Sequence, residues 1–197
     1  MERKIVYFEK PGNENTDEVL RIAKQRAQEL GIKTVVVAST VGATAVKAVE
    51  VFKGMKIVIV THSTGFKEPN KQEFTEENRK VVESKGATVL TTALTFSGLN
   101  RAMRQGTITQ APSTYVIGDV VTATLRMICQ GMKVACEIAT MAADAGLVRT
   151  DEDCIAIAGT GAPEYGRGAD TAVVIRPANA QLFFDTRVKE ILCKPRL

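Results

Sequence analysis

The chain has 197 residues and a formal net charge of +4, from 26 Lys and Arg against 22 Asp and Glu, and 45% of its residues are hydrophobic. This length suits one domain and is too short for a complete (β/α)₈ barrel, which takes about 250 residues. The two signs of charge are interleaved, without the basic cluster that is typical of nucleic-acid-binding proteins. We therefore expect a single soluble domain over residues 1–197 that binds no nucleic acid.

The N-terminus and the cysteines favour a cytoplasmic protein. The opening residues, MERKIVYFEK, lack the apolar core of a secretory signal, and no stretch approaches the roughly 18 apolar residues of a membrane helix. The four cysteines form no CxxC pair and no other metal-ligand spacing; they are Cys129, Cys136, Cys154 and Cys193. We expect buried structural thiols, no metal site and no membrane contact.

Short β-branched runs alternate with helical periods in the first half of the chain. This pattern predicts strands at 4–8, 34–38, 56–60 and 87–91 and helices at 15–30, 43–52 and 74–85. Asn15 and Glu18 have the spacing of a capping box at the start of the first helix, and Gly31 ends it. The apolar run TVVVA does not alternate, as in a strand covered on both faces. The order of elements predicts a mostly parallel sheet.

The second half of the chain is less regular. We expect a short helix at 96–105, a loop at 106–114, one long helix at 119–145, and strands at 153–158 and 171–175, with 181–197 either strand or helix. About a dozen glycine-rich residues join the last two strands, too few for a crossover helix, which predicts an antiparallel return. The predicted fold is a three-layer α/β/α sandwich, with a mostly parallel sheet and an antiparallel edge strand.

The most informative loop, 39–45, follows the strand 34–38. In open α/β sheets, ligands bind beyond the carboxyl ends of the strands. Ser39, Thr40 and Thr44 offer hydroxyl groups, Gly42 permits close backbone approach, and the N–H groups of the next helix attract phosphate. The alternative is that Ser39 or Thr44 only caps that helix, and the residues alone do not decide between the two.

A second loop, 61–65, repeats this chemistry beside the first. It contains Thr61, His62 and Ser63, and His62 is the only histidine of the sequence. His62 is either an acid–base group or an ordinary polar loop residue. No carboxylate adjoins it in sequence, so Glu9 is our candidate to orient it in space.

The third loop, 159–168, is glycine-rich, but a strand rather than a helix follows it, so it is not a dinucleotide-binding fingerprint. Gly161 makes it flexible, Arg167 suits a phosphate and Tyr165 suits stacking on an aromatic ligand. The alternative is an ordinary connection. The sequence contains no GxSxG, Walker or HExxH motif.

The segment TVVVASTVGATAVKAV resembles the effector-loop region of the C-terminal α/β domain of pyruvate kinases, at Ser39, Gly42, Thr44 and Ala45. The segment DEDCIAIAGTG…GADTAVVIRP is similar to the last two strands of that domain, and the likeness covers residues 15–178. It implies a three-layer domain with a mixed five-stranded core sheet whose last strand is antiparallel. In pyruvate kinases this domain is regulatory and binds a sugar bisphosphate, while catalysis belongs to a barrel that this chain is too short to contain.

Val41, Ala43 and the lack of tryptophan depart from that pattern and argue against a sugar bisphosphate. The sequence looks closer to stand-alone, mainly prokaryotic proteins with this fold. This resemblance implies FMN as the ligand, with the FMN phosphate at residues 39–44 and the isoalloxazine ring against residues 62–65 or Tyr165. The leading hypothesis is a domain that binds a phosphorylated small molecule, FMN first, without pyruvate kinase activity. The alternatives are a flavin-dependent or phosphoester-acting enzyme that uses His62, and a structural or oligomerising module that forms homo-oligomers. The substrate and pathway stay open.

Overall fold

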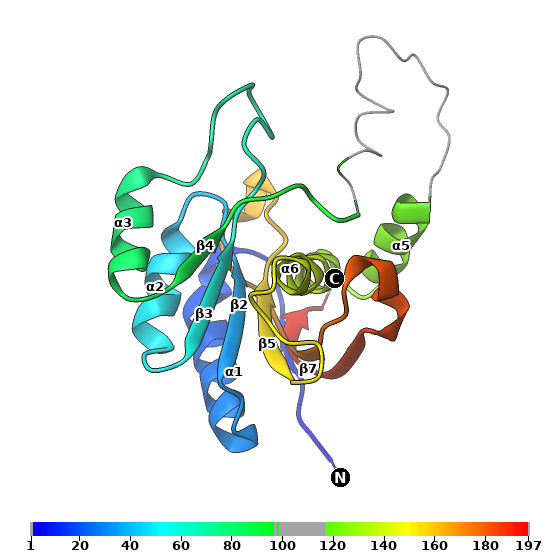
Figure 1. The fold of residues 1–197 in the computed structure, drawn as a ribbon. Helices are drawn as coiled ribbons and strands as arrows, with labels where there is room; N and C mark the ends of the chain where they lie inside the picture. Colours follow the sequence, from blue (N-terminus) through cyan, green and yellow to red (C-terminus); the bar gives the residue numbers. More distant parts are fainter. Residues whose placement is uncertain (1, 97, 99–116, 197) are drawn as a thin grey trace.

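The computed structural model describes residues 2–96, 98 and 117–196, and within them one seven-stranded sheet has the order β1-β7-β6-β5-β2-β3-β4 (Figure 1). The strands are β1 (Val6–Phe8), β2 (Thr34–Ala38), β3 (Lys56–Val60), β4 (Thr88–Leu90), β5 (Cys154–Ala158), β6 (Thr171–Arg176) and β7 (Arg187–Pro195). All the strands predicted from the sequence are present, with differences of a few residues at their ends.

The sheet is mostly parallel, as predicted. Strand β2 pairs in parallel with β3 and with β5, and β4 is parallel to β3. Strands β5 and β6 are antiparallel, with Ala156 opposite Val173, so the antiparallel return is confirmed. Strand β7 is antiparallel to β6 and β1 is parallel to β7, which extends the sheet by two strands beyond β6. The ambiguous segment 181–197 therefore contributes a strand.

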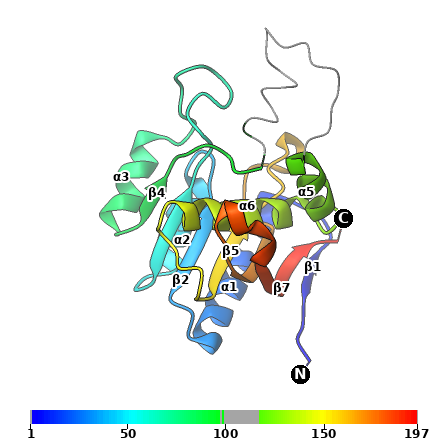
Figure 2. The same ribbon diagram turned by 45° about the vertical axis from the view of Figure 1, so that its right-hand side comes forward.

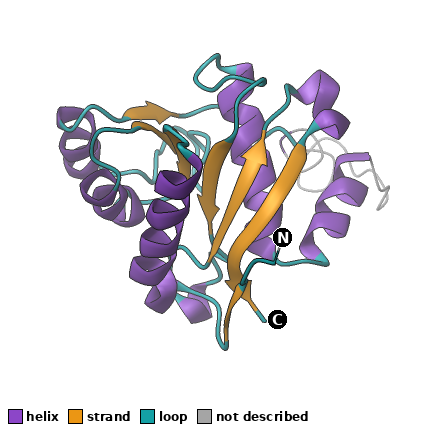
Figure 3. Cartoon of the chain, turned by 90° about the horizontal axis from the view of Figure 1, so that it is seen from below, coloured by secondary structure: helices purple, strands orange, loops and turns teal. Residues whose placement is uncertain are grey.

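Helices cover both faces of the sheet, so the three-layer sandwich is confirmed (Figures 1 and 3). Helices α1 (Thr16–Leu30), α2 (Ala43–Val51) and α3 (Glu76–Ser84) lie on one face, and α6 (Gln130–Asp144) with α5 (Ile117–Arg126) on the other. Side chains of β2 alternate between the layers: Val35 and Val37 pack in the core beneath α1 and α2, and Val36 packs beneath α6. A continuous apolar run is what this double burial requires.

The single helix expected at 119–145 is wrong, because the chain breaks between α5 and α6. Helix α5 ends at Arg126, and Cys129 is extended, with φ −177°. The Cys129 sulfur accepts a hydrogen bond from the Met132 N–H at 3.3 Å and caps α6. Cysteine is not among the usual capping residues, so the sequence carries no clear signal for this break.

The capping box expected at the start of α1 is also absent. The Asn15 side chain donates instead to the Lys10 carbonyl at 2.8 Å. Glu18 pairs with Arg21 at 2.7 Å. Thr16 is buried, and its hydroxyl accepts from the Ala169 N–H at 3.1 Å. The helix start is therefore fixed by a distant loop rather than by its own first turn.

The four cysteines are buried free thiols, as expected. Burial raises the pKa of Cys136, Cys154 and Cys193 to about 12 in each case. These thiols are therefore poor nucleophiles and poor metal ligands at neutral pH. Within the described residues, no helix combines the length and hydropathy needed to cross a membrane. The helix and loop predicted at 96–105 and 106–114 lie outside the described residues, apart from Phe96 and Gly98.

Candidate functional site

A cavity of about 760 Å³ lies at the carboxyl ends of β2, β3 and β5, with α6 along its other side. This is the edge of an open α/β sheet at which ligands bind. Of the residues predicted from the sequence, the cavity wall brings together Ser39, Thr40, Thr44, Thr61, His62, Gly161 and Arg167. Gly42, Ser63 and Tyr165 are not among its lining residues.

The loop 39–44 both supports the start of α2 and lines the cavity. Ser39 is buried, and its hydroxyl accepts a hydrogen bond from the Ala45 N–H at 3.3 Å, which supports the first turn of α2. Its own N–H donates to the Val60 carbonyl at 3.0 Å, so β3 holds the loop in place. Thr40 and Thr44 line the cavity beside the N-terminus of α2. The cap and the hydroxyl-lined wall therefore coexist.

Gly42 serves packing between two helices. It precedes α2 with φ +107°, and a Cβ built on it would lie 2.4 Å from Cβ of Asn78 on α3. The Asn78 side chain also donates to the Val41 carbonyl at 2.9 Å. The close approach that the glycine permits is therefore toward α3.

The second loop is tied to the neighbouring strand ends. Thr61 is buried, and its hydroxyl donates to the His62 carbonyl at 2.8 Å. The oxygen of the same hydroxyl lies 2.7 Å from the hydroxyl oxygen of Thr91. The Ser63 carbonyl accepts from the Phe66 N–H at 3.2 Å in the turn that follows. This turn places Phe66 in the cavity wall, where its ring centroid lies 4.0 Å from that of His62.

A carboxylate orients His62, but it is not the one expected. Glu73 Oε2 lies 2.8 Å from His62 Nδ1, and Gln72 donates to the His62 carbonyl at 3.0 Å. Glu9 contacts Arg196 instead, at 3.4 Å, so the proposed role of Glu9 is wrong. Because Nδ1 is engaged, the ring position of His62 is fixed within the cavity wall.

Glu73 also binds two other basic side chains. Lys67 Nζ lies 3.3 Å and Arg167 Nη2 3.1 Å from Glu73 Oε1. Burial raises the pKa of Glu73, but its hydrogen bonds with His62 and Lys67 outweigh that effect and leave the pKa below the ordinary value. The ionised carboxylate thus joins the loop after β3 to the loop after β5.

The loop 159–168 is anchored at its base by Asp170, which is fully buried. Asp170 Oδ2 accepts from the N–H groups of Thr160 at 3.0 Å and Gly12 at 3.1 Å. Tyr165 packs on the N-terminal segment: a Cβ on Gly12 would lie 2.0 Å from the Tyr165 carbonyl oxygen. The structure therefore gives Tyr165 a structural contact outside the cavity lining.

Sequence reasoning missed several charged residues of the cavity, which come from α5, α6 and the loop after β3. The basic ones that line it in addition to Arg167 are Lys67, Arg126 and Lys133, and Glu137 is acidic. Lys133 and Glu137 form a buried ion pair at i, i+4 on α6. The sequence signal for these two residues is the presence of two charged side chains on the apolar face of a predicted helix. Within the described ranges, no group of three or more His, Cys, Asp or Glu residues is arranged to hold a metal ion.

The comparison with protein families agrees with the α/β fold. The family described as "Pyruvate kinase, alpha/beta domain" matches residues 17–175. The match begins in α1 and ends in β6, so it includes the three strand–loop junctions that surround the cavity. This chain belongs to the pyruvate kinase α/β domain family.

Proposed function

We propose that this chain is a binding domain for a phosphorylated small molecule, with FMN the favoured ligand, and not a pyruvate kinase. The observation that carries the proposal is the cavity itself, whose hydroxyl-lined helix N-terminus lies among mostly basic charged residues. Its volume of about 760 Å³ lies within the usual range for small-molecule sites.

The phosphate would bind at the 39–44 loop. The N–H groups at the start of a helix lack partners within the helix and carry its positive dipole end. Thr40 and Thr44 add hydroxyl groups, and Lys67 and Arg167 line the same cavity. Since each neutral hydrogen bond contributes about 0.5–1.5 kcal/mol and each charged one about 1.5–3 kcal/mol, binding depends on several contacts together.

The aromatic ring of FMN would lie against the apolar part of the wall. Phe66 and Leu94 line the cavity together with the α6 side chains Val134, Ile138 and Met141. Flat ligands bind on such apolar and aromatic surfaces. When bound, FMN supplies redox chemistry, and the residues of this chain hold and orient it.

Titration calorimetry with FMN and with riboflavin, which lacks the phosphate, tests the proposal. We expect FMN to bind at least about tenfold more tightly, since the lost contacts are worth more than about 1.4 kcal/mol. The double variant Thr40→Val/Thr44→Val should lose most of this difference, while Thr88→Val, an exposed change on β4, should keep it. A protein that purifies colourless and gives no heat with FMN refutes the flavin proposal.

A phosphoester-acting enzyme is the second candidate, favoured by the 2.8 Å contact between His62 and Glu73 in the cavity wall. A carboxylate on Nδ1 leaves Nε2 of the imidazole to exchange a proton with a ligand. The test is release of inorganic phosphate from FMN and other phosphomonoesters, with His62→Gln as the inactive comparison. If the wild-type protein releases none, His62 has no such role.

A further inference from the structure

The ion pair between Lys133 and Glu137 lies in the cavity wall and takes no part in the proposed phosphate site. Both residues come from α6, which crosses the sheet face (Figure 2). Their side chains are only 6% and 3% exposed, yet both line the cavity. The pair therefore faces the ligand space from the α6 side of the cavity.

Packing alone does not explain this pair. The other α6 residues of the wall are the polar Gln130 and the apolar Val134, Ile138 and Met141. Replacing a buried ion pair with apolar residues of similar volume is often neutral or stabilising, because both charges lose their hydration. A role toward the ligand gives a reason for placing the charges here.

The hydrogen bonds of the Lys133–Glu137 pair determine which donors and acceptors it presents to a ligand. Glu137 Oε1 accepts from the Phe96 N–H at 3.0 Å, and Oε2 accepts from Lys133 Nζ. Each carboxylate oxygen retains a second acceptor position, and the ammonium group of Lys133 retains further N–H donors. The pair thus presents a donor and an acceptor side by side, with the carboxylate held in one orientation by the backbone of Phe96.

We propose that Lys133 and Glu137 recognise a ring edge that carries a carbonyl next to an N–H, and so select heterocycles with an imide edge. Lys133 donates to the carbonyl and Glu137 accepts from the N–H. The imide of the isoalloxazine ring, at its N3 position, has this pattern. The inference rests on the proposed binding function. It adds which residues of the cavity wall form hydrogen bonds with the ring of the ligand.

The test compares FMN with N3-methyl-FMN, which has the same phosphate and ring system but no N–H at the edge. We expect the wild-type protein to bind the methylated ligand at least about tenfold more weakly, because it lacks the N–H that donates to the charged acceptor. The variant Lys133→Met/Glu137→Gln should lose most of this preference, because a neutral acceptor replaces the charged one. It leaves no unpaired buried charge and keeps an acceptor for the Phe96 N–H.

The control is Arg79→Met/Glu83→Gln, which removes an ion pair of the same spacing on α3, outside the cavity. It should retain the tenfold preference. If the wild-type protein binds both ligands equally, the inference is wrong while the proposed function stands; if it binds neither, both are wrong. If Lys133→Met/Glu137→Gln still prefers FMN to N3-methyl-FMN by the same factor as the wild-type protein, the inference is also overturned. Should that variant fail to fold, Glu137→Gln alone takes its place, since it keeps an acceptor for the Phe96 N–H, and an undiminished preference in that variant overturns the inference.

Discussion

Single charged side chains determine how the loops around the cavity are held. Glu73 is the clearest case, because its side chain is only 14% exposed and contacts His62, Lys67 and Arg167. A carboxylate is costly to bury unless basic groups and hydrogen-bond donors compensate it. Here the compensation comes from two loops, so the same contacts that keep Glu73 ionised also fix the cavity rim.

We expect Glu73→Gln to lower the free energy of unfolding by about 1–2 kcal/mol, because charge-assisted hydrogen bonds become neutral ones. Glu68→Gln is the matched control, since Glu68 lies in the same loop and its ion pair with Lys71 is exposed. It should cost less than about 0.5 kcal/mol. Urea denaturation at neutral pH measures both values.

The pH dependence of the free energy of unfolding is a second test of the Glu73 contacts. The folded state lowers the pKa of Glu73, so its contribution to stability is present above the unfolded-state pKa and is lost as the pH falls through the folded one. The difference between wild type and Glu73→Gln should therefore shrink in acid. An equal loss for Glu68→Gln, or a difference that does not change with pH, contradicts this role.

The identity of the site residues could be predicted only in part. His62, Ser39, Thr44 and Arg167 stand out because they directly follow strands or lie in glycine-rich loops. Glu73 belongs to the stretch before α3, and its contact with His62 depends on how that stretch returns to β3. No spacing rule describes such a contact, so the sequence alone does not single out Glu73 over other carboxylates such as Glu9.

At the scale of elements, α2 is bounded by two glycines with positive φ. Gly42, at φ +107°, meets Asn78 of α3, whereas Gly54, at φ +81°, has no atom within 4 Å of its Cβ position. Both backbones disfavour a side chain, but only Gly42 adds a steric conflict. Substitutions at these two glycines therefore distinguish the cost of backbone strain from the cost of a packing conflict.

We expect Gly54→Ala to cost about 1–2 kcal/mol of unfolding free energy from strain alone. Gly42→Ala should cost about 1–3 kcal/mol more, because α3 must shift to accommodate the methyl group. Chemical denaturation of both variants gives the comparison. Equal losses would show that Asn78 moves aside freely. Gly42 is therefore a poor position at which to test ligand binding, since its substitution disturbs α2 and α3 together.

The elements themselves were largely predictable, because buried parallel strands have long apolar runs and their helices end at glycine. Helix α1, for example, ends at Gly31 with φ +66°. The break at Cys129 was missed because a sulfur atom caps α6 and the helical pattern continues across it. The segment 181–197 is ambiguous in sequence because β7 pairs with β6 in an irregular register and with the distant β1. Such pairing is not encoded in local periodicity.

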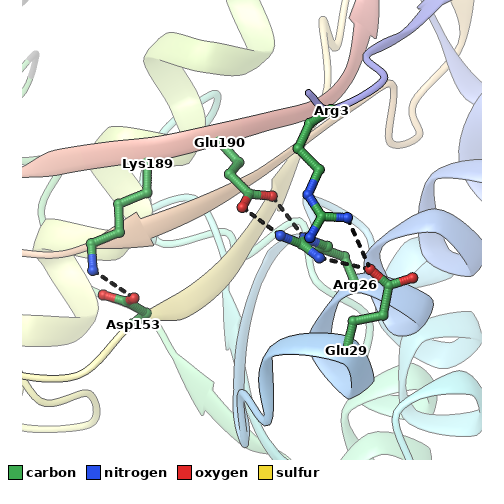
Figure 4. A network of polar contacts seen from close by, with 6 residues as sticks. All are labelled: Arg3, Arg26, Glu29, Asp153, Lys189 and Glu190. Carbon is green, nitrogen blue, oxygen red and sulfur yellow. Dashed lines mark hydrogen bonds and ion pairs between the residues drawn. The ribbon is translucent and has the colours of Figure 1, made fainter. Parts of the chain in front are cut away.

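At the scale of the whole molecule, Arg26 connects α1 to the far end of the chain. Its side chain is 9% exposed and binds Glu190 of β7 through two contacts, at 2.6 and 2.7 Å, and Glu29 of its own helix at 2.7 Å (Figure 4). Arg3 lies 3.9 Å from the same Glu29. This cluster supports the two strands, β7 and β1, that extend the sheet beyond β6.

We expect Arg26→Met to lower the free energy of unfolding by about 2 kcal/mol, because Glu190 loses both contacts while remaining partly buried. Lys189→Met is the matched control on the same strand. Lys189 is 39% exposed and pairs with Asp153 (Figure 4). Asp153 keeps a second contact, with Arg176, when Lys189 is replaced. That change should cost less than about 1 kcal/mol.

The pH profile distinguishes loss of the ion pair from loss of packing by the arginine stem. Hydrogen bonds from Arg26 hold the pKa of Glu190 below its ordinary value. The pair therefore stabilises the fold above the unfolded-state pKa and ceases to do so as the pH falls through the folded one. Denaturation curves of wild type and Arg26→Met should converge in acid. Methionine keeps much of the volume of the arginine stem, so curves that stay equally far apart in acid would show that the loss in Arg26→Met does not come from the ion pair with Glu190.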